Sequence, residues 1–219
     1  MKKTKGILIL LLLSISLYGQ KKVSGIEFYA TTNIGVTQYY GDLNTHFYYN
    51  TIIPLAYGLV VGYQINPMIG IRGQYMMGVI KGANNQYSFT SDLWDVTLCP
   101  TISLSNLVTA NIKQRMIDTY FFGGVGIARF DSRLYDIKGT LINEYEQNQE
   151  YIAVIGVGLT CAVLPLLDVN LEYGNRYLFV DDKLDLYPSL GLNDHYGYYS
   201  FGVTFKFWRS AKRLSMLNF

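Results

Sequence analysis

Residues 55–65 of this chain read Leu55-Ala56-Tyr57-Gly58-Leu59-Val60-Val61-Gly62-Tyr63-Gln64-Ile65. Large apolar side chains occupy every second position, and mostly small or polar residues lie between them. This alternation is typical of a β-strand with two different faces, because successive side chains of a strand point to opposite sides. The stretch is also as long as a strand that crosses a lipid bilayer, which needs roughly 9–11 residues. It therefore predicts a membrane-crossing strand.

The same alternation recurs along the whole chain and predicts eight strands. They lie at residues 26–36, 55–65, 69–79, 93–104, 120–130, 151–163, 168–176 and 199–207. The connections at 41–52, 81–90, 131–150 and 181–195 are long and polar, whereas those at 66–67 and 164–165 are short. Long loops at one end and tight turns at the other are typical of outer-membrane barrels. We therefore predict an all-β fold, an eight-stranded antiparallel transmembrane up-and-down β-barrel. The connection at 105–118 is longer than this pattern explains.

The first 19 residues have the pattern of a secretory signal peptide. Lys2, Lys3 and Lys5 precede an apolar run, and Gly19 is a small residue at the expected cleavage site. A membrane anchor is the alternative, but the run is shorter than the roughly 20 apolar residues that a spanning helix needs. We expect residues 1–19 to be the signal peptide, 20–207 the barrel and 208–219 a short periplasmic tail.

The composition suits a protein whose surface faces lipid. Only 16% of the residues are charged, compared with about 25% in soluble domains. A closed barrel satisfies every backbone hydrogen bond inside a bilayer without a free edge. The chain has no basic patch that would indicate nucleic-acid binding. We predict a monomeric barrel in contact with outer-membrane lipid, and we keep a soluble, lipocalin-like binder as an alternative.

Glycine indicates which face points inward. Most strand glycines share a face with the polar residues, and the interior of an eight-stranded barrel is only wide enough for side chains. Charges on this face must be paired. We predict an interior charge network of Glu27, Arg72, Asp95, Asp168, Glu172, Arg176 and Lys206, with Glu27 beside Lys206. Aromatic residues near strand ends, among them Tyr57, Tyr120, Tyr151, Tyr173 and Tyr199, are expected in the two interfacial belts.

The sequence contains no recognisable catalytic motif, and we predict no enzymatic activity, cofactor or metal site. We interpret the interior charges as a plug that pairs its own buried ions. An enzyme that modifies membrane lipids through His46 or His195, both in predicted outer loops, remains an alternative. Asp181, Asp182 and Asp185 are interpreted as a solvated acidic loop. Cys99 and Cys161 are predicted to be free thiols, because a strand lies between their strands.

The predicted periplasmic end carries a surplus of basic residues. Lys113 and Arg115 lie in the long 105–118 connection, and Arg209, Lys212 and Arg213 lie in the tail. Basic residues often flank membrane segments, so this surplus has a simple explanation. The alternative is a surface that docks an acidic periplasmic protein. Such docking should weaken with salt, because exposed charges are screened beyond about 10 Å at 0.1 M.

Three stretches resemble the small outer-membrane β-barrel proteins of Bacteroidota, which share the architecture of the OmpA and OmpX barrels. They are Tyr39-Tyr40-Gly41-Asp42-Leu43 after the first strand, Tyr120-Phe121-Phe122-Gly123-Gly124-Val125-Gly126 in the fifth, and Glu172-Tyr173-Gly174-Asn175-Arg176-Tyr177 followed by Asp181-Asp182. The resemblance implies an outer-membrane location. It extends to PorG-like barrels, and through them it implies an accessory role in type IX secretion with a periplasmic partner.

Overall fold

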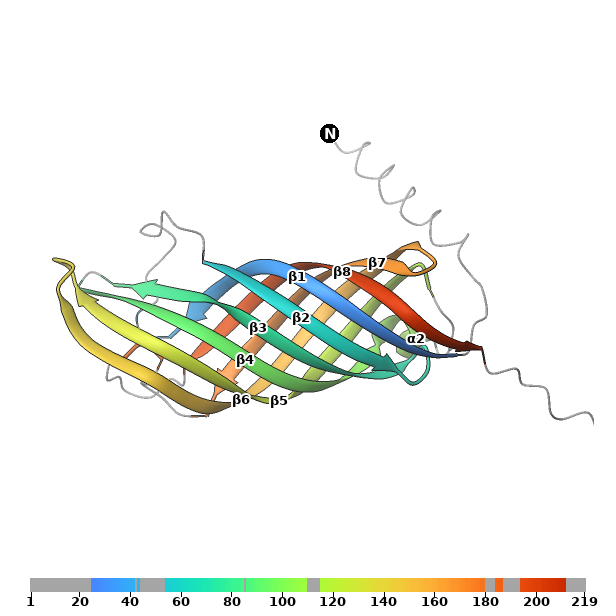
Figure 1. Cartoon of the computed structure of the whole chain (residues 1–219), viewed down its shortest axis with the longest axis horizontal. Helices are drawn as coiled ribbons and strands as arrows, with labels where there is room; N and C mark the ends of the chain where they lie inside the picture. The colour runs from blue at the N-terminus through green and yellow to red at the C-terminus, as the bar shows by residue number, and fades with distance from the viewer. Residues whose placement is uncertain are drawn as a thin grey trace, which may run out of the picture.

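Eight strands close into one barrel (Figure 1). The computed structural model describes residues 25–41, 43, 54–84, 86–109, 115–179, 184–186 and 194–211. Each strand pairs antiparallel with the next, and β1 pairs with β8. This is the predicted fold. The predicted signal peptide and residues 212–219 lie outside the described residues. The strands are β1 (Gly25–Tyr40), β2 (Leu55–Gln64), β3 (Ile69–Ala83), β4 (Tyr87–Ser103), β5 (Ile117–Asp136), β6 (Leu141–Leu164), β7 (Leu167–Leu178) and β8 (His195–Ala211).

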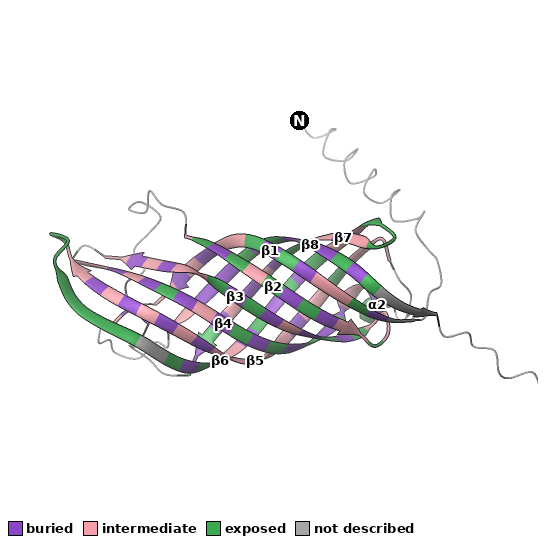
Figure 2. Cartoon of the chain, viewed as in Figure 1, coloured by how far each residue is buried: buried purple, intermediate pink, exposed green. Residues whose placement is uncertain are grey.

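The two faces of each strand have opposite burial, as Figure 2 shows. On β2, Tyr57, Leu59 and Val61 are exposed, whereas Ala56 and Val60 are buried. The outward residues are large and apolar, which suits a wall in contact with lipid hydrocarbon. The structure also agrees with the inference that strand glycines lie where space inside the barrel is short. A side chain at Gly124 would overlap the backbone carbonyl of Leu98 on β4, so only glycine lets β5 approach at this point.

At the end where β1 begins and β8 finishes, two connections are short and one forms a helix. Between β2 and β3, the side-chain oxygen of Asn66 accepts hydrogen bonds from the amides of Met68 and Ile69, at 2.8 and 2.9 Å. Between β4 and β5, the long connection folds in part into α2 (Leu104–Thr109). The Asn106 side chain ties α2 to the first turn by donating to the carbonyl of Pro67 at 2.8 Å.

At the opposite end of the barrel, the structure differs from the loops that the sequence predicts. Residues 81–90 and 131–150 are predicted as long polar loops, but they form strand extensions joined by tight turns. Asn84 accepts hydrogen bonds from the amides of Gln86 and Tyr87, at 2.9 and 2.7 Å. Gly139 closes the β5–β6 turn with a φ of 76°. The outward side chains change from apolar to charged where these strands leave the bilayer. Because the sequence is polar there, it resembles that of loops.

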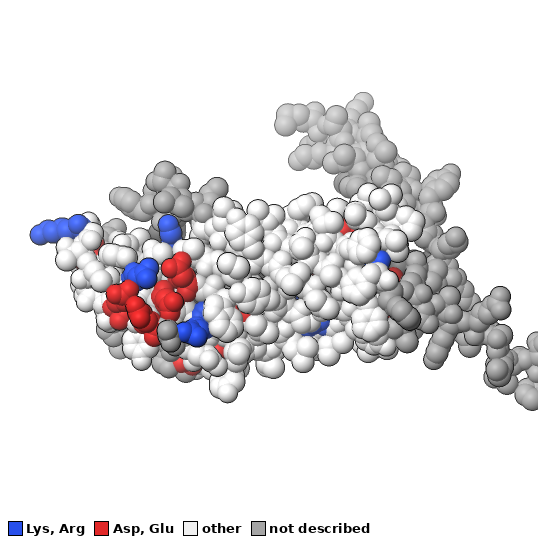
Figure 3. All heavy atoms as spheres, in the orientation of Figure 1, with Lys and Arg blue, Asp and Glu red and all other residues white. Residues whose placement is uncertain are grey.

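Figure 3 shows this change on the surface. Charged side chains gather at the end that carries the β5–β6 hairpin, whereas the middle of the visible wall carries almost none. Arg133 on β5 and Glu144 on β6 form an exposed ion pair there at 2.7 Å. The apolar wall thus marks the membrane, and the charged hairpin stands beyond it on the predicted extracellular side.

Candidate functional site

The centre of the barrel interior holds an ion pair that joins opposite walls. Arg72 on β3 donates two hydrogen bonds to Glu172 on β7, at 2.6 and 2.8 Å. Both side chains are almost fully buried. Tyr120 donates a further hydrogen bond to Glu172, and Arg72 lies 4.1 Å from the centre of the Phe122 ring. The paired geometry and the ring together replace the water that both charges lose on burial.

A second pair lies nearer the extracellular end. Arg176 on β7 donates to Asp95 on β4 at 2.9 Å, and both side chains are buried. Tyr196 on β8 donates to the same Asp95 oxygen at 2.9 Å. The guanidinium of Arg176 also contacts the Tyr198 ring, 5.3 Å from its centre. Three strands are thereby connected through the lumen.

A third cluster lies near the periplasmic end. The Lys206 ammonium on β8 lies 2.5 Å from Asp168 on β7 and 3.6 Å from Glu27 on β1. The structure thus places all seven predicted network residues inside the barrel, with Glu27 beside Lys206. Tyr120 is a correction: it is predicted for an interfacial belt but faces the lumen, because its position has the same parity as Phe122.

Sequence reasoning missed the contents of the extracellular half of the lumen. It predicts a small, polar interior, but this half is filled by large apolar side chains. These side chains lie at positions that the two-residue alternation assigns to the inward face, when the alternation is followed beyond the predicted strand ends. The buried set includes Leu43, Ile80, Phe89, Leu93, Phe130, Leu134, Ile152, Leu178 and Leu184.

The connection between β7 and β8 contributes to this apolar filling. Leu184 is buried, and its carbonyl accepts a hydrogen bond from Ser132 at 2.7 Å. The Tyr39 hydroxyl on β1 donates hydrogen bonds to the carboxylates of Asp185, at 2.8 Å, and Asp194, at 2.6 Å. Asp185 is therefore buried in the barrel mouth, which corrects its interpretation as part of a solvated loop. Asp181 and Asp182 lie outside the described residues.

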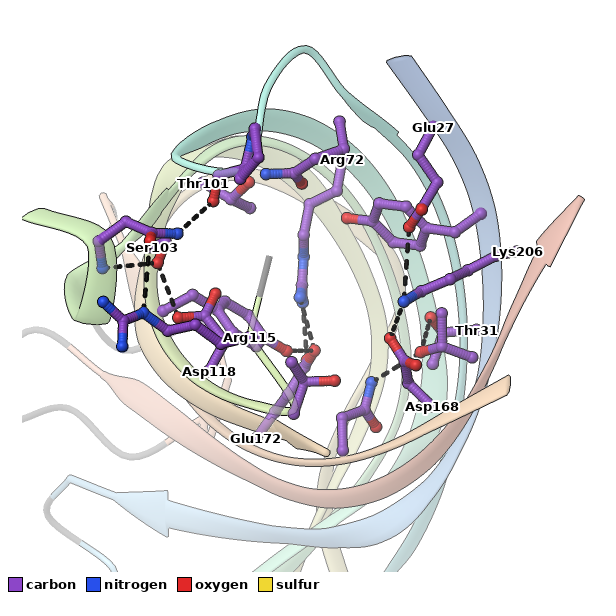
Figure 4. A pocket seen from close by; sticks show the side chains of 18 residues that line it. Glu27, Thr31, Arg72, Thr101, Ser103, Arg115, Asp118, Asp168, Glu172 and Lys206 are labelled. Atoms are coloured by element: carbon purple, nitrogen blue, oxygen red, sulfur yellow. Dashed lines mark hydrogen bonds and ion pairs between the residues drawn. The ribbon is translucent and has the colours of Figure 1, made fainter. Parts of the chain in front are cut away.

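Below the Arg72–Glu172 pair, a polar cavity of about 140 Å³ remains (Figure 4). Its lining includes Glu27, Asp168 and Lys206 on one side and Ser103, Arg115 and Asp118 on the other. Arg115 is predicted to dock a partner. Its guanidinium donates to Asn106 at 3.3 Å and to Thr109 at 2.5 Å, so it ties the end of this connection to α2. The docking role stays a prediction.

Of the other four predicted docking residues, the structure describes only Arg209. Arg209 lies within β8, which extends past the predicted end at Phe207 to Ala211, and its register partner on β1 is Glu27. Lys113, Lys212 and Arg213 lie outside the described residues. In the described part of the chain, no cluster of His, Cys, Asp and Glu side chains could hold a metal ion. Cys99 and Cys161 are free thiols, as predicted.

His195 corrects a further loop assignment, because it is the first residue of β8. Its imidazole stacks on the rings of Tyr40 and Tyr177, with centroid distances of 5.0 and 5.1 Å. The sequence predicts a loop histidine that could serve catalysis, and the structure places this one in an aromatic cluster on the outer wall. His46 lies outside the described residues.

Comparisons with known proteins agree with the barrel architecture. The chain covers 97% of Neisserial surface protein A with a TM-score of 0.54 at 16% identity, over 82% of its own length. It covers 99% of a major outer membrane protein from Thermus thermophilus with a TM-score of 0.51 at 12% identity, over 83% of its own length. At these identities the likeness concerns the fold.

No curated protein matches the sequence. None of the helices in the described ranges is long and apolar enough to cross a membrane. The model of the outer membrane protein beta-barrel domain matches residues 7–207. This chain therefore belongs to the outer membrane protein beta-barrel family, and it resides in the outer membrane.

Proposed function

We propose that this protein is a non-enzymatic barrel, closed to solutes, that serves the outer membrane as a structural or accessory component. The observation that carries the proposal is the filling of the lumen at two levels. The Arg72–Glu172 and Arg176–Asp95 pairs cross its middle, and apolar side chains such as Phe89 and Phe130 fill its extracellular half. A solute would have to break buried ion pairs and displace packed rings to pass.

Conductance measurements test this proposal. The full chain is refolded and inserted into planar lipid bilayers, and single-channel currents are recorded at physiological salt. We expect a quiet membrane, because the described side chains fill the lumen with two buried ion pairs and an apolar cluster. Stable, large conductance steps would contradict the proposal. The variant Phe89→Ala with Phe130→Ala serves as a positive comparison, since opening the apolar half should increase brief currents if this half closes the barrel.

The accessory role would operate at the periplasmic end. The helix α2 there is braced by Asn106 and Arg115, and it exposes two apolar side chains: Leu107 is 51% and Val108 83% exposed. A minimal turn between two strands needs no such helix. We infer that α2, with the basic residues Lys113, Arg115, Arg209, Lys212 and Arg213, docks a periplasmic protein with an apolar and acidic surface. The PorG-like resemblance of the sequence supports the proposal that this partner belongs to a type IX secretion machinery.

Crosslinking from native membranes tests the docking. Partners captured by the wild-type chain are compared with those captured by Leu107→Ser with Val108→Ser, and by a chain that lacks residues 212–219. We expect both variants to lose the same partner, and we expect salt to weaken its capture. Unchanged capture by folded variants would refute the docking. Secretion by the host strain, measured in parallel, separates a secretion accessory from a general envelope protein.

A further inference from the structure

The outer wall of the barrel carries a cluster of five rings across β1, β7 and β8, near the extracellular end. His195 lies between Tyr40 and Tyr177, at interplanar angles of 13° and 19°. Tyr173 and Tyr199 pack against each other at a centroid distance of 4.5 Å. The hydroxyls of Tyr40 and Tyr199 are 3.2 Å apart, which joins the two groups. We call these five residues the ring cluster.

The strand register arranges the ring cluster in rows. Tyr40, His195 and Tyr177 are cross-strand neighbours, and Val36, Tyr199 and Tyr173 form a row further down the wall. Between them lie Gln38, Gly197 and Asn175. Gly197 leaves room for its neighbours, because a side chain there would lie 3.0 Å from Tyr173 and 3.2 Å from Tyr40. Asn175 donates to the Tyr177 hydroxyl at 3.2 Å, so the two rows nearest the extracellular end are rich in hydrogen-bonding groups.

A largely apolar hollow continues directly below the ring cluster. It has a volume of about 560 Å³, and Tyr173 and Tyr199 belong both to it and to the ring cluster. Gly35 and Gly158 also line it, but only through backbone atoms, because their missing side chains would point into the lumen. Its apolar lining comes from four strands and consists of Ile34, Val36, Val157, Leu159, Leu171 and Phe201.

The order of these surfaces matches the order of groups in an outer-leaflet lipid. Hydroxyl, amide and imidazole groups lie toward the extracellular boundary, and a hollow lined mainly by apolar side chains lies toward the centre of the membrane. A sugar ring has an apolar face that stacks on aromatic rings and hydroxyls that bond to tyrosine and asparagine. We propose that the ring cluster and the hollow bind a lipid with a sugar head group, of the lipid A type. The sugar rests on the ring cluster, and an acyl chain lies in the hollow.

Several features distinguish this wall from an ordinary interfacial belt. A belt is an enrichment of aromatic residues at the interface, and Tyr151 on β6, 71% exposed, is such a residue. The ring cluster instead holds a stack of three rings and a tilted pair, joined through hydroxyls, with Gly197 between them. It also lies against a hollow that shares two of its residues. Because the wall lies within the outer membrane, lipid is the molecule that reaches it first, and this holds independently of any periplasmic partner.

Native mass spectrometry of the full chain in detergent micelles tests the proposal. The folded protein is titrated separately with lipid A, phosphatidylethanolamine and phosphatidylglycerol. We expect lipid A to be retained about tenfold more tightly than either phospholipid, a ratio that corresponds to about 1.4 kcal/mol. Equal retention of all three lipids would overturn the proposal. Equal retention of lipid A and phosphatidylglycerol would also overturn it, because charge alone would then explain the binding.

Two variants locate the site. The double variant Tyr177→Leu with His195→Leu keeps the wall apolar but removes the stack, and Leu171→Trp fills the hollow. Each should abolish the preference for lipid A. The matched controls are Tyr151→Leu, an exposed tyrosine outside the ring cluster, and Leu98→Trp on β4; both should bind as the wild type does. Gel mobility confirms that each variant is folded. If the site variants retain the preference, lipid A binds elsewhere and the proposed site is wrong.

Discussion

Replacing Glu172 with glutamine should destabilise the barrel strongly, although the two side chains have nearly the same shape. Arg72 donates two hydrogen bonds to Glu172 and is only 2% exposed. The amide oxygen of glutamine can retain one of these bonds. The variant loses one charge-assisted hydrogen bond, which contributes about 1.5–3 kcal/mol. It also leaves a buried guanidinium without its counter-charge, so the free energy of unfolding should fall by about 3–5 kcal/mol in total.

Equilibrium unfolding by urea in lipid vesicles measures this change, with the fluorescence of the two tryptophans, Trp94 and Trp208, and gel mobility as readouts. The double variant Arg72→Met with Glu172→Gln should regain most of the lost stability, because the unpaired charge is then removed as well. The matched control is Glu144→Gln, since Glu144 pairs with Arg133 at the exposed end of the barrel. We expect no measurable change there. A Glu172→Gln variant as stable as the wild type, or a double variant no better than the single one, would refute the reasoning.

Three further substitutions test other parts of the structure. Tyr39→Phe removes the hydroxyl that bonds to Asp185 and Asp194, so closure of the barrel mouth should weaken by about 1–3 kcal/mol. Hydrogen exchange at residues 184–186 should then increase, and unchanged exchange would contradict this. Gly124→Val should prevent folding, because its side chain would overlap the Leu98 carbonyl. Gly73→Ala should fold normally, because its Cβ would lie 4.0 Å from the nearest atom, the Thr97 carbonyl oxygen; gel mobility measures folding in both cases. Asn66→Ala should lower the free energy of unfolding by about 1–2 kcal/mol through two lost hydrogen bonds, and Asn66→Asp should restore it in the same urea assay.

Alternation made the transmembrane part of this fold predictable. The period of two is fixed by strand geometry, so Leu59 and Arg72 could be assigned to opposite faces without knowledge of their neighbours. The same rule placed the interior charges, because a narrow barrel must pair them. It also predicted Glu27 as a neighbour of Lys206, because the first and last strands must pair. It could not predict the Arg72–Glu172 pair, since these residues come from strands on opposite walls of the barrel.

The errors arose where the surroundings of the strands change. Beyond the bilayer, the outer face no longer has to be apolar, so Arg133 and Glu144 resemble loop residues although they lie in strands. The lumen likewise changes from polar to apolar along its length, so the sequence analysis gave Phe89 no role. Tyr120 was misassigned for another reason: its place near a strand end suggests a belt, whereas its parity with Phe122 directs it into the lumen. The helix α2 carries too few residues for a helical pattern to stand out, and its contacts through Asn106 and Arg115 depend on the closed barrel.

The turn at Gly139 has a consequence for work on living cells. It joins the hairpin that extends farthest beyond the barrel in Figure 1, and nothing lies within 4 Å of the position where its side chain would be. A short epitope inserted after Gly139 would therefore lie outside the cell, beyond the charged part of the hairpin, without disturbing the lumen or the lipid-facing wall. An antibody applied to intact bacteria would then report both the orientation of the barrel and the number of copies that reach the surface.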